Sequence, residues 1–370
     1  MSVPHPLNAQ AVTWADPARG ARFAQWIAAI APDQAIDPAT LRLASADASF
    51  RRYFRVDRTD APGSRIVMDA PPDKEDCRPF VRVAALLHEA GVRAPEVLAW
   101  DEAQGFMLLT DLGEQTLLTA LDPAQPTAAL PYFKDAAATL LSWQRASRPG
   151  VLPAYDAALL QRELQLFPDW YLTRHKGLAL DEATRSLLAQ TFARIVERNL
   201  AAPSVFVHRD FMPRNLMLPR EGFDPADPAR RLGVLDFQDA VYGPVTYDIA
   251  CLMRDAFLTW EEDMVLDVTI RYWEQARKTG LLDFEGWSED FGAFYRAVDW
   301  MALQRHLKVA GIFARLTLRD GKPQYLADAP RFLLYIRNTA ARYRELTPLL
   351  RLIDRIEGWE AASGFAFGRV

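Results

Sequence analysis

The fold of this 370-residue chain is decided by one stretch of sequence, VHRDFMPRN at residues 207–215. Asp210 in this stretch is followed by four residues and then by Asn215. A second aspartate, Asp236, comes later, in the apolar run VLDFQ at residues 234–238. This order is typical of enzymes that transfer a phosphoryl group from Mg·ATP. One carboxylate takes the proton of the attacking hydroxyl, and an amide and a second carboxylate offer oxygen atoms to the metal.

Composition excludes several other classes of protein. Half of the residues are hydrophobic, a quarter are charged and the formal net charge is −5, without the basic excess of nucleic-acid binders. Cys77 and Cys251 lie far apart and have neither disulfide nor zinc-site spacing. No apolar run approaches eighteen residues, and the first ten residues lack the pattern of a signal peptide. We therefore expect a cytoplasmic protein that binds neither nucleic acid nor membrane.

Hydrophobic periodicity divides the chain into a first third of mixed structure and a mainly helical remainder. In the first third, strands are expected at 41–44, 50–56, 65–68, 97–100 and 106–110, and helices at 19–31 and 79–90. Later helices are expected at 132–146, 159–175, 181–200, 247–260, 264–278, 291–313 and 331–346. Three short apolar runs, at 205–208, 216–218 and 233–236, interrupt the helical part. Short strands with charged residues at their ends are a typical place for a site.

Three ordered pieces of the sequence resemble the aminoglycoside phosphotransferase-like branch of the protein-kinase-like fold. They are HxDxxxxN at 208–215, Asp236 after a short strand, and YDIA at 247–250. The resemblance implies an α+β, bilobal protein-kinase-like fold with two domains. Residues 1–110 would form a small antiparallel-sheet N-lobe that binds nucleotide. Residues 111–370 would form a larger, mainly helical C-lobe with catalytic and sugar-binding roles.

The same resemblance assigns roles around the central stretch, with ATP and Mg²⁺ as cofactors. Asp210 would be the catalytic base, and Arg214 in the same loop would face the transferring phosphate. Asn215 and Asp236 would hold the metal. Asp248 would anchor the loop rather than meet substrate. Taken alone, either Asp210 or Asp236 could be an ordinary loop or helix-capping carboxylate, but the ordered set favours the catalytic interpretation.

The nucleotide side departs from the usual kinase pattern, since there is no GxGxxG and no Val-Ala-Ile-Lys strand. Residues 45–54, SADASFRRYF, stand where relatives place a phosphate-covering turn, and Ser49 could donate a hydrogen bond there. Met68 or a neighbour occupies the place of the expected lysine. We hypothesise that Arg51 or Arg52 supplies the phosphate-facing charge, with Lys74 as a further candidate. The alternative is that both arginines are surface residues. The adenine-contacting residues are expected, from their position, to be Leu109, Thr110 and Leu112. The alternative is an unoccupied core strand, in which Leu and Thr would look the same.

A narrower resemblance concerns the acceptor. Segments 45–55, 68–72, 208–215 and 307–313 look like those of bacterial anomeric kinases of N-acetylmuramate and N-acetylglucosamine, which serve cell-wall recycling. The likeness spans residues 40–345 and includes the missing lysine. It implies a small-molecule sugar as substrate, phosphorylated at its anomeric hydroxyl.

Two expected helices would supply the sugar-binding side chains. The candidates are Glu163, Asp169 and Trp170 in one helix, and Arg305, His306 and Lys308 in the other. An aromatic ring can stack on a sugar, carboxylates can accept from its hydroxyls, and Arg305 or Lys308 could pair with a lactyl carboxylate. The alternative for Trp170 is an ordinary core position.

Two other functions stay open at this stage. The first is a kinase for another small hydroxylated metabolite, such as an aminoglycoside, a ketoamine or choline. The chain lacks the dense acidic composition expected of a pocket for polycationic drugs, which argues against the aminoglycoside. The second is a nucleotide-binding pseudokinase module, which the missing lysine suggests and the intact set of Asp210, Asn215 and Asp236 disfavours.

Overall fold

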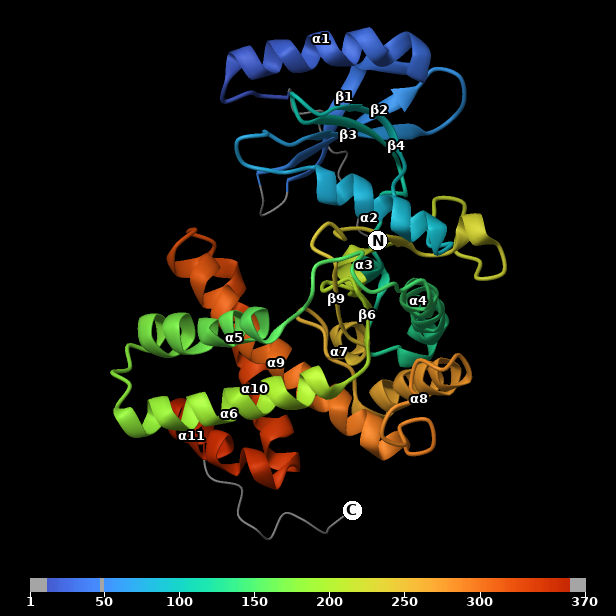
Figure 1. The fold of residues 1–370 in the computed structure, drawn as a ribbon. Coiled ribbons are helices and arrows are strands. Elements are labelled where there is room, and N and C mark those ends of the chain that lie inside the picture. Colours follow the sequence, from blue (N-terminus) through green and yellow to red (C-terminus); the bar gives the residue numbers. More distant parts are fainter. Residues whose placement is uncertain (1–11, 47–49, 360–370) are drawn as a thin grey trace. The chain divides into compact units, whose positions relative to one another are not determined.

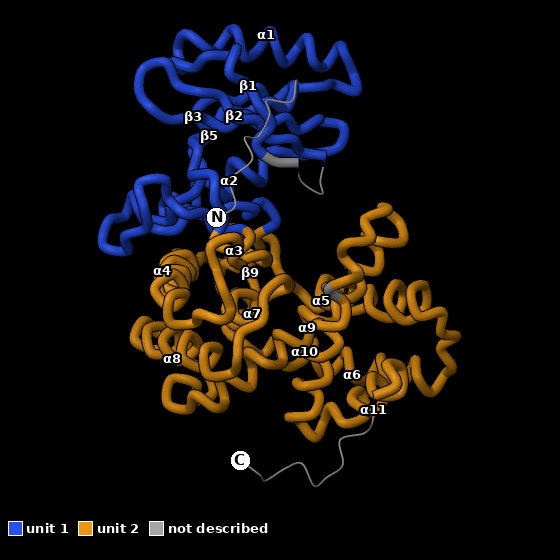
Figure 2. The backbone as a smooth tube through the Cα atoms, turned by 180° about the vertical axis from the view of Figure 1, so that it is seen from behind, with its two compact units in different colours: residues 1–116, 215–239 blue, residues 117–214, 240–370 orange. Residues whose placement is uncertain are grey.

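The computed structural model describes residues 12–46 and 50–359, and it divides the chain into two compact units (Figures 1 and 2). Unit 1 consists of Met1–Thr116 and Asn215–Asp239, and unit 2 of Leu117–Arg214 and Ala240–Val370. The first unit therefore runs slightly past the expected boundary at residue 110 and also takes in a later segment. The division falls inside the HRD stretch, between its last two residues.

Unit 1 is built on a five-stranded antiparallel sheet in the order β1-β2-β3-β5-β4. Its strands are β1 (Ile36–Ala46), β2 (Arg52–Arg58), β3 (Ser64–Asp69), β4 (Val97–Asp101) and β5 (Phe106–Thr110). Its helices are α1 (Pro17–Gln34), α2 (Arg78–Glu89) and the short 3₁₀ turn η3 (Pro228–Arg230). A small hairpin of β7 (Leu216–Met217) and β8 (Gly233–Val234) completes the unit. The expected strands and both expected helices are thus present, with boundaries shifted by a few residues.

Helix α1 lies along the sheet (Figure 1), and its apolar side chains pack against it. Asp16 caps the helix by accepting a hydrogen bond from the Ala18 amide, 2.9 Å away. Phe23 and Ile27, one helical turn apart, are buried against side chains of β2, β3 and β5. The ring centroids of Phe23 and Phe106 lie 5.3 Å apart, edge to face. Helical spacing on one side and strand alternation on the other therefore build this core.

A buried carboxylate ties α1 to the sheet. Asp69, at the end of β3, is 1% exposed and accepts hydrogen bonds from two arginines. Arg19 of α1 approaches one carboxylate oxygen at 2.5 and 2.8 Å, and Arg52 of β2 approaches the other at 2.7 and 3.1 Å. The Arg52 guanidinium also lies 4.0 Å from the ring centroid of Trp14. Arg52 is therefore bound into the packing of unit 1.

The segment from residue 215 to 239 belongs to unit 1 through several contacts. The Val234 amide donates to the Arg93 carbonyl at 2.8 Å, and the rings of Phe80 and Phe237 lie 4.8 Å apart. Gly113 has a φ of +136°, and a Cβ atom there would lie 2.4 Å from the carbonyl oxygen of Leu218. Only glycine allows this close approach of the two backbones.

Unit 2 is mainly helical. Its α-helices are α3 (Leu117–Ala120), α4 (Pro126–Arg145), α5 (Ala157–Leu166), α6 (Glu182–Ala201), α7 (Thr246–Met253), α8 (Glu262–Lys278), α9 (Phe291–Leu318), α10 (Ala329–Arg342) and α11 (Thr347–Glu357). Shorter turns are the π-helix η1 (Phe167–His175) and the 3₁₀ helices η2 (Pro213–Asn215, which ends at the first residue of unit 1), η4 (Pro323–Asp328) and η5 (Arg344–Leu346). The strands β6 (Ser204–Val207) and β9 (Val241–Pro244) pair antiparallel. In the described residues, no helix is both long and apolar enough to span a bilayer.

Unit 2 differs from the sequence-based expectation at several elements. The helix expected over 159–175 changes at Phe167 into the π-helix η1, where Pro168 has no amide hydrogen to donate. The helix expected over 247–260 ends at Met253. Strand β9 and the helices α3 and α11 were not predicted at all. Strand β9 is only four residues long, and it depends on pairing with a strand some forty residues earlier, which no local pattern reveals.

The buried pairing of Asp69 makes a testable prediction about unit 1. Replacing Asp69 with Asn should lower the free energy of unfolding by about 3 kcal/mol, because two partly buried guanidinium groups lose their counter-charge. Urea unfolding followed by circular dichroism would measure the change. Asp60→Asn is the control, since Asp60 pairs with Arg58 on the exposed surface at 2.8 Å and its loss should leave the midpoint unchanged. Equal midpoints for the two variants would contradict a structural role for Asp69.

Candidate active site

The loop that carries Asp210 leaves the end of β6 and is held by a buried carboxylate. Asp248 of α7 accepts the backbone N–H of His208 at 2.7 Å on one oxygen and that of Arg209 at 3.0 Å on the other. The Asp210 amide donates to His208 Nδ1 at 3.2 Å. Asp248 therefore has the anchoring role expected from the sequence, and it fixes the two residues directly before the proposed base.

The backbone at Arg209 is in a costly conformation. Its φ is +76°, in the left-handed region, where a residue with a Cβ atom pays roughly 1–2 kcal/mol. The two hydrogen bonds to Asp248 offset part of this cost. Burial raises the pKa of Asp248 to about 7, although the amides of His208 and Arg209 act in the opposite direction. The two amide donors thus favour the ionised carboxylate, while its burial disfavours it.

A buried charge cluster surrounds the Arg209 side chain. Glu163 Oε1 accepts from Arg209 Nη2 at 2.6 Å and pairs with Lys308 Nζ at 3.0 Å, while Oε2 accepts from the Tyr155 hydroxyl. Lys308 Nζ also donates to the Tyr247 hydroxyl at 3.2 Å. Burial alone would raise the pKa of Glu163, but Lys308 and Arg209 outweigh it and the pKa is lowered. Glu163 is therefore an ionised, fully engaged carboxylate.

Two other predicted sugar ligands are buried in α9 among different partners. Burial lowers the pKa of His306 to about 3 with help from the neighbouring Arg305, so its imidazole is neutral. The ring stacks on Tyr335 at 4.7 Å, and Nε2 lies 3.3 Å from the Arg254 carbonyl oxygen. For Arg305 burial opposes the charged form, but Cys251, Tyr247, Asp210 and Asp255 together raise its pKa overall. Arg305 is thus a buried cation, and its Nη1 donates to the Arg254 carbonyl at 3.5 Å.

The remaining sugar candidates lie on η1 and have local contacts. Asp169 is exposed and accepts from Gln165 at 2.9 Å. Trp170 packs against the core of unit 2, and the Arg174 guanidinium covers its ring at 3.9 Å from the centroid. The structure therefore gathers Glu163 and Lys308 around Arg209 in the loop that carries Asp210, but gives Asp169, Trp170 and His306 other neighbours. Their role in binding sugar stays a prediction.

The candidate metal ligands both belong to unit 1. Asn215 Nδ2 lies 3.5 Å from Asp236 Oδ2, and Gln238 Nε2 donates to Asp236 Oδ1 at 3.0 Å. Asp236 has a φ of +64°, and its side chain is 38% exposed. Within the described residues no three His, Cys, Asp or Glu side chains gather to hold a metal. An amide and a carboxylate nevertheless fit Mg²⁺, which commonly takes one or two protein ligands and completes its shell with water and phosphate oxygens.

Arg51 stands next to this pair. Its guanidinium lies 4.0 Å from Asp236 Oδ1 and 4.0 Å from Glu75 Oε2, and its side chain is only 11% exposed. Glu75, just ahead of α2, also accepts the Phe50 amide at 3.3 Å. Arg51 is thus a cation that lies between Glu75 and the candidate metal ligand Asp236. Arg52 instead pairs with Asp69. Kinase relatives are expected to hold their lysine with a glutamate of the following helix, and in the sequence Glu75 lies slightly too early for that place. The structure nevertheless pairs Glu75, three residues before α2, with Arg51.

The other predicted nucleotide residues are less informative. Ser49 lies outside the described residues. Leu109 is buried in β5, the Thr110 amide donates to the Glu96 carbonyl at 3.0 Å, and the Leu112 carbonyl accepts from Arg93 at 2.9 Å. Arg214 is exposed, with its guanidinium 5.2 Å from the ring centroid of Phe257. The adenine-contacting and phosphate-facing roles of these residues stay predictions.

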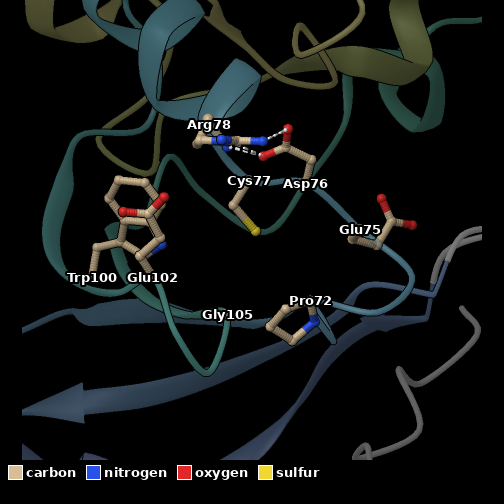
Figure 3. A pocket seen from close by; sticks show the side chains of 8 residues that line it. All are labelled: Pro72, Glu75, Asp76, Cys77, Arg78, Trp100, Glu102 and Gly105. Atoms are coloured by element: carbon tan, nitrogen blue, oxygen red, sulfur yellow. Dashed lines mark hydrogen bonds and ion pairs between the residues drawn. The ribbon is translucent and has the colours of Figure 1, made fainter.

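A pocket of about 190 Å³ opens in unit 1 beside the start of α2 (Figure 3). Its lining residues are Pro72, Glu75, Asp76, Cys77, Arg78, Trp100, Glu102 and Gly105. Glu75 is the partner of Arg51, but neither Arg51 nor the metal candidates line the pocket. We therefore do not assign this pocket to the phosphates.

Comparison with known proteins identifies the family. The sequence profile described as the phosphotransferase enzyme family matches residues 40–287, which is more than half of the chain. The chain belongs to this family. Sequence relatives named N-acetylmuramate/N-acetylglucosamine kinase occur in Pseudomonas aeruginosa and Neisseria meningitidis. The first is 50% identical over 88% of this chain and 91% of the relative, and the second is 46% identical over 94% and 99%.

Solved structures of similar fold confirm the protein-kinase-like architecture expected from the sequence. An ethanolamine kinase of Plasmodium vivax is 10% identical, with a TM-score of 0.58, and the match covers 93% of each chain. The GDP complex of aminoglycoside 2′-phosphotransferase-IIIa is 14% identical, with a TM-score of 0.57, covering 87% of this chain and 99% of the other. At this identity the similarity concerns the fold alone. The phosphotransferase thus has a small antiparallel sheet in unit 1 and a mainly helical unit 2.

The double hydrogen bond to Asp248 makes the second prediction. Asn at this position can accept only one of the two amides, so Asp248→Asn should lower the free energy of unfolding by about 1–3 kcal/mol. It should also lower phosphotransferase turnover, because the loop carrying Asp210 loses one attachment. Unfolding curves and turnover measured on the same preparation would check this.

Asp290→Asn provides a matched control for that substitution. Asp290 caps α9 by accepting the Ala293 amide at 3.1 Å, a position where Asn caps as well as Asp. Stability and turnover of this variant should equal those of the native protein. If Asp248→Asn behaved in the same way, the loop would not depend on the carboxylate.

Proposed function

We propose that this phosphotransferase is an ATP-dependent sugar kinase that phosphorylates the anomeric hydroxyl of N-acetylmuramate and N-acetylglucosamine. The proposal is supported chiefly by relatives of that name at 46–50% identity, which cover nearly the whole chain. Asp210, in its doubly anchored loop, is consistent with this chemistry. The protein would act in peptidoglycan recycling in the cytoplasm, where ATP is available.

The transfer follows from the roles of named residues. The anomeric oxygen of the sugar attacks the γ-phosphorus of ATP, and the bond from that phosphorus to the β,γ-bridging oxygen breaks, so that ADP leaves with the electron pair. Asp210 orients the sugar hydroxyl and takes its proton as the bond to phosphorus forms. Asn215 and Asp236 would hold Mg²⁺, which when bound neutralises charge on the phosphates.

We propose that Arg51 replaces the lysine of other kinases. In those enzymes a strand lysine contacts the phosphates and is held by a helix glutamate. Here Arg51 is placed between Glu75 and Asp236, which keeps a cation beside the proposed metal ligands. Guanidinium groups bind phosphate oxygens in a bidentate manner, so the exchange of residue preserves the chemistry. The absence of a lysine therefore need not mean loss of catalysis.

The substrate assignment is tested by offering purified protein Mg·ATP and a panel of acceptors. The panel contains N-acetylmuramate, N-acetylglucosamine, glucose, kanamycin, a fructosamine and choline. We expect turnover of the N-acetyl sugars, with a product whose phosphorus NMR signal couples to the anomeric proton. Asp210→Asn should lower that turnover by ~10²–10⁴-fold, the usual contribution of a positioned base, while ATP still binds.

Other outcomes of that experiment would contradict parts of the proposal. Turnover confined to choline, kanamycin or the fructosamine would replace the acceptor. ATP binding without any turnover would favour a pseudokinase module. A loss below about threefold in Asp210→Asn would remove Asp210 as the base, because a positioned base contributes far more.

The role of Arg51 predicts opposite behaviour for two adjacent arginines. Arg51→Met should weaken Mg·ATP binding by about tenfold or more, since a hydrogen bond to a charged group contributes roughly 1.5–3 kcal/mol. Arg52→Met should instead lower the unfolding midpoint, because it breaks the contact with Asp69, and leave the ATP affinity of the folded protein unchanged. Calorimetric titration with ATP and thermal unfolding would separate the two effects. The reverse pattern would assign the phosphates to Arg52.

A further inference from the structure

Arg209, the residue directly before the proposed base, is held at both of its ends. Its backbone amide donates to Asp248 at 3.0 Å, and its guanidinium donates to Glu163 at 2.6 Å. Between these two attachments the backbone is kept at a φ of +76°, which an arginine rarely adopts. A strained residue stays in place only while its surroundings hold it there. A displacement of the Arg209 backbone therefore also displaces Asp210, the next residue.

Glu163 is itself immobilised. Its side chain is 7% exposed, and both carboxylate oxygens are engaged, one by Arg209 and Lys308 and the other by the Tyr155 hydroxyl. Tyr155 and Lys308 come from outside helix α5, which carries Glu163, so the carboxylate is fixed from three directions. Because both oxygens are engaged by the protein, Glu163 is better suited to hold Arg209 in place than to bind a substrate.

We propose that Glu163 is a positioning residue for phosphoryl transfer, and that it acts by fixing Arg209 and thereby the peptide that carries Asp210. This inference rests on the proposed role of Asp210 in the transfer. It gives Glu163 a function different from contact with the sugar, and it joins α5 and α9 to the catalytic loop through one carboxylate.

The chain contains a matched control for this cluster. Glu357 of α11 accepts from the Tyr171 hydroxyl at 3.0 Å and from Lys176 Nζ at 2.8 Å. It therefore repeats the combination of glutamate, tyrosine and lysine in the same unit, at a side-chain exposure of 13%. No catalytic candidate takes part in the Glu357 contacts. Glu357→Gln removes the same kind of charge as Glu163→Gln without touching the loop.

The kinetic test compares Glu163→Gln with Glu357→Gln. We expect Glu163→Gln to lower kcat by about 10–100-fold, because a small misplacement of a reacting group has an effect of this size. The KM of the sugar should stay within about twofold, since a positioning residue makes no contact with the acceptor. Glu357→Gln should keep the native kcat. A raised sugar KM with unchanged kcat would overturn the proposal and make Glu163 a sugar ligand.

A second measurement does not depend on activity. The amides of His208 and Arg209 should exchange with deuterium about tenfold faster in Glu163→Gln than in the native protein, because local opening of the loop becomes easier. Glu357→Gln should leave this exchange unchanged. Equal exchange in all three proteins, or equal acceleration in both variants, would overturn the proposal. A native protein that turns over no acceptor, while the exchange difference between the two variants persists, would contradict the proposed function. That result would leave the attachment of Arg209 by Glu163 in place.

If Glu163→Gln does not fold, Arg209→Lys tests the same contact from the other side. Lysine keeps the charge but cannot reproduce the guanidinium geometry, so kcat should fall with an unchanged sugar KM. Arg337→Lys is its control, since Arg337 donates to Asp354 at 2.6 Å with a side-chain exposure close to that of Arg209. Similar kcat values for the two lysine variants would contradict the positioning role.

Discussion

The carboxylate of Asp248 is the interaction that holds the loop carrying Asp210, the proposed base. Its two oxygens accept the amides of His208 and Arg209, so the loop is fixed at the two residues before Asp210. Asp248 is fully buried in α7, a helix with no exposed side chain. Burying a carboxylate costs free energy unless its oxygens accept hydrogen bonds, and here the donors are amides of the loop that carries Asp210. Core and loop therefore stabilise each other.

The arginines of unit 1 have two different roles. Arg19 and Arg52 neutralise the buried Asp69 and hold α1 on the sheet, while Arg51 is directed to Glu75 and Asp236. Adjacent residues of a strand-like segment point to opposite sides, which separates the structural arginine from the one proposed for phosphate. Because a guanidinium stays charged at any physiological pH, it can supply the positive charge that a lysine places beside the phosphates in other kinases.

Much of the architecture was predictable because it follows from local patterns. The strands of the sheet, α1 and α2, and the long helix α9 were predicted from alternation and helical spacing, with small boundary errors. The π-helix after α5 and the early end of α7 were not, since they depend on Pro168 and on tertiary packing. The short strand β9 needs a partner that is distant in the sequence.

By itself the sequence determined the family-type fold and the order of Asp210, Asn215 and Asp236, because these residues belong to short motifs with constant spacing. The tertiary structure alone decided which side chains pair with the residues around these motifs. Glu163 meets Arg209 and Lys308 only because α5 and α9 pack in one particular register, and Glu75 meets Arg51 only because the chain approaches α2 at one particular place. Such contacts join residues 24 to 145 positions apart, and no local pattern of side chains encodes them.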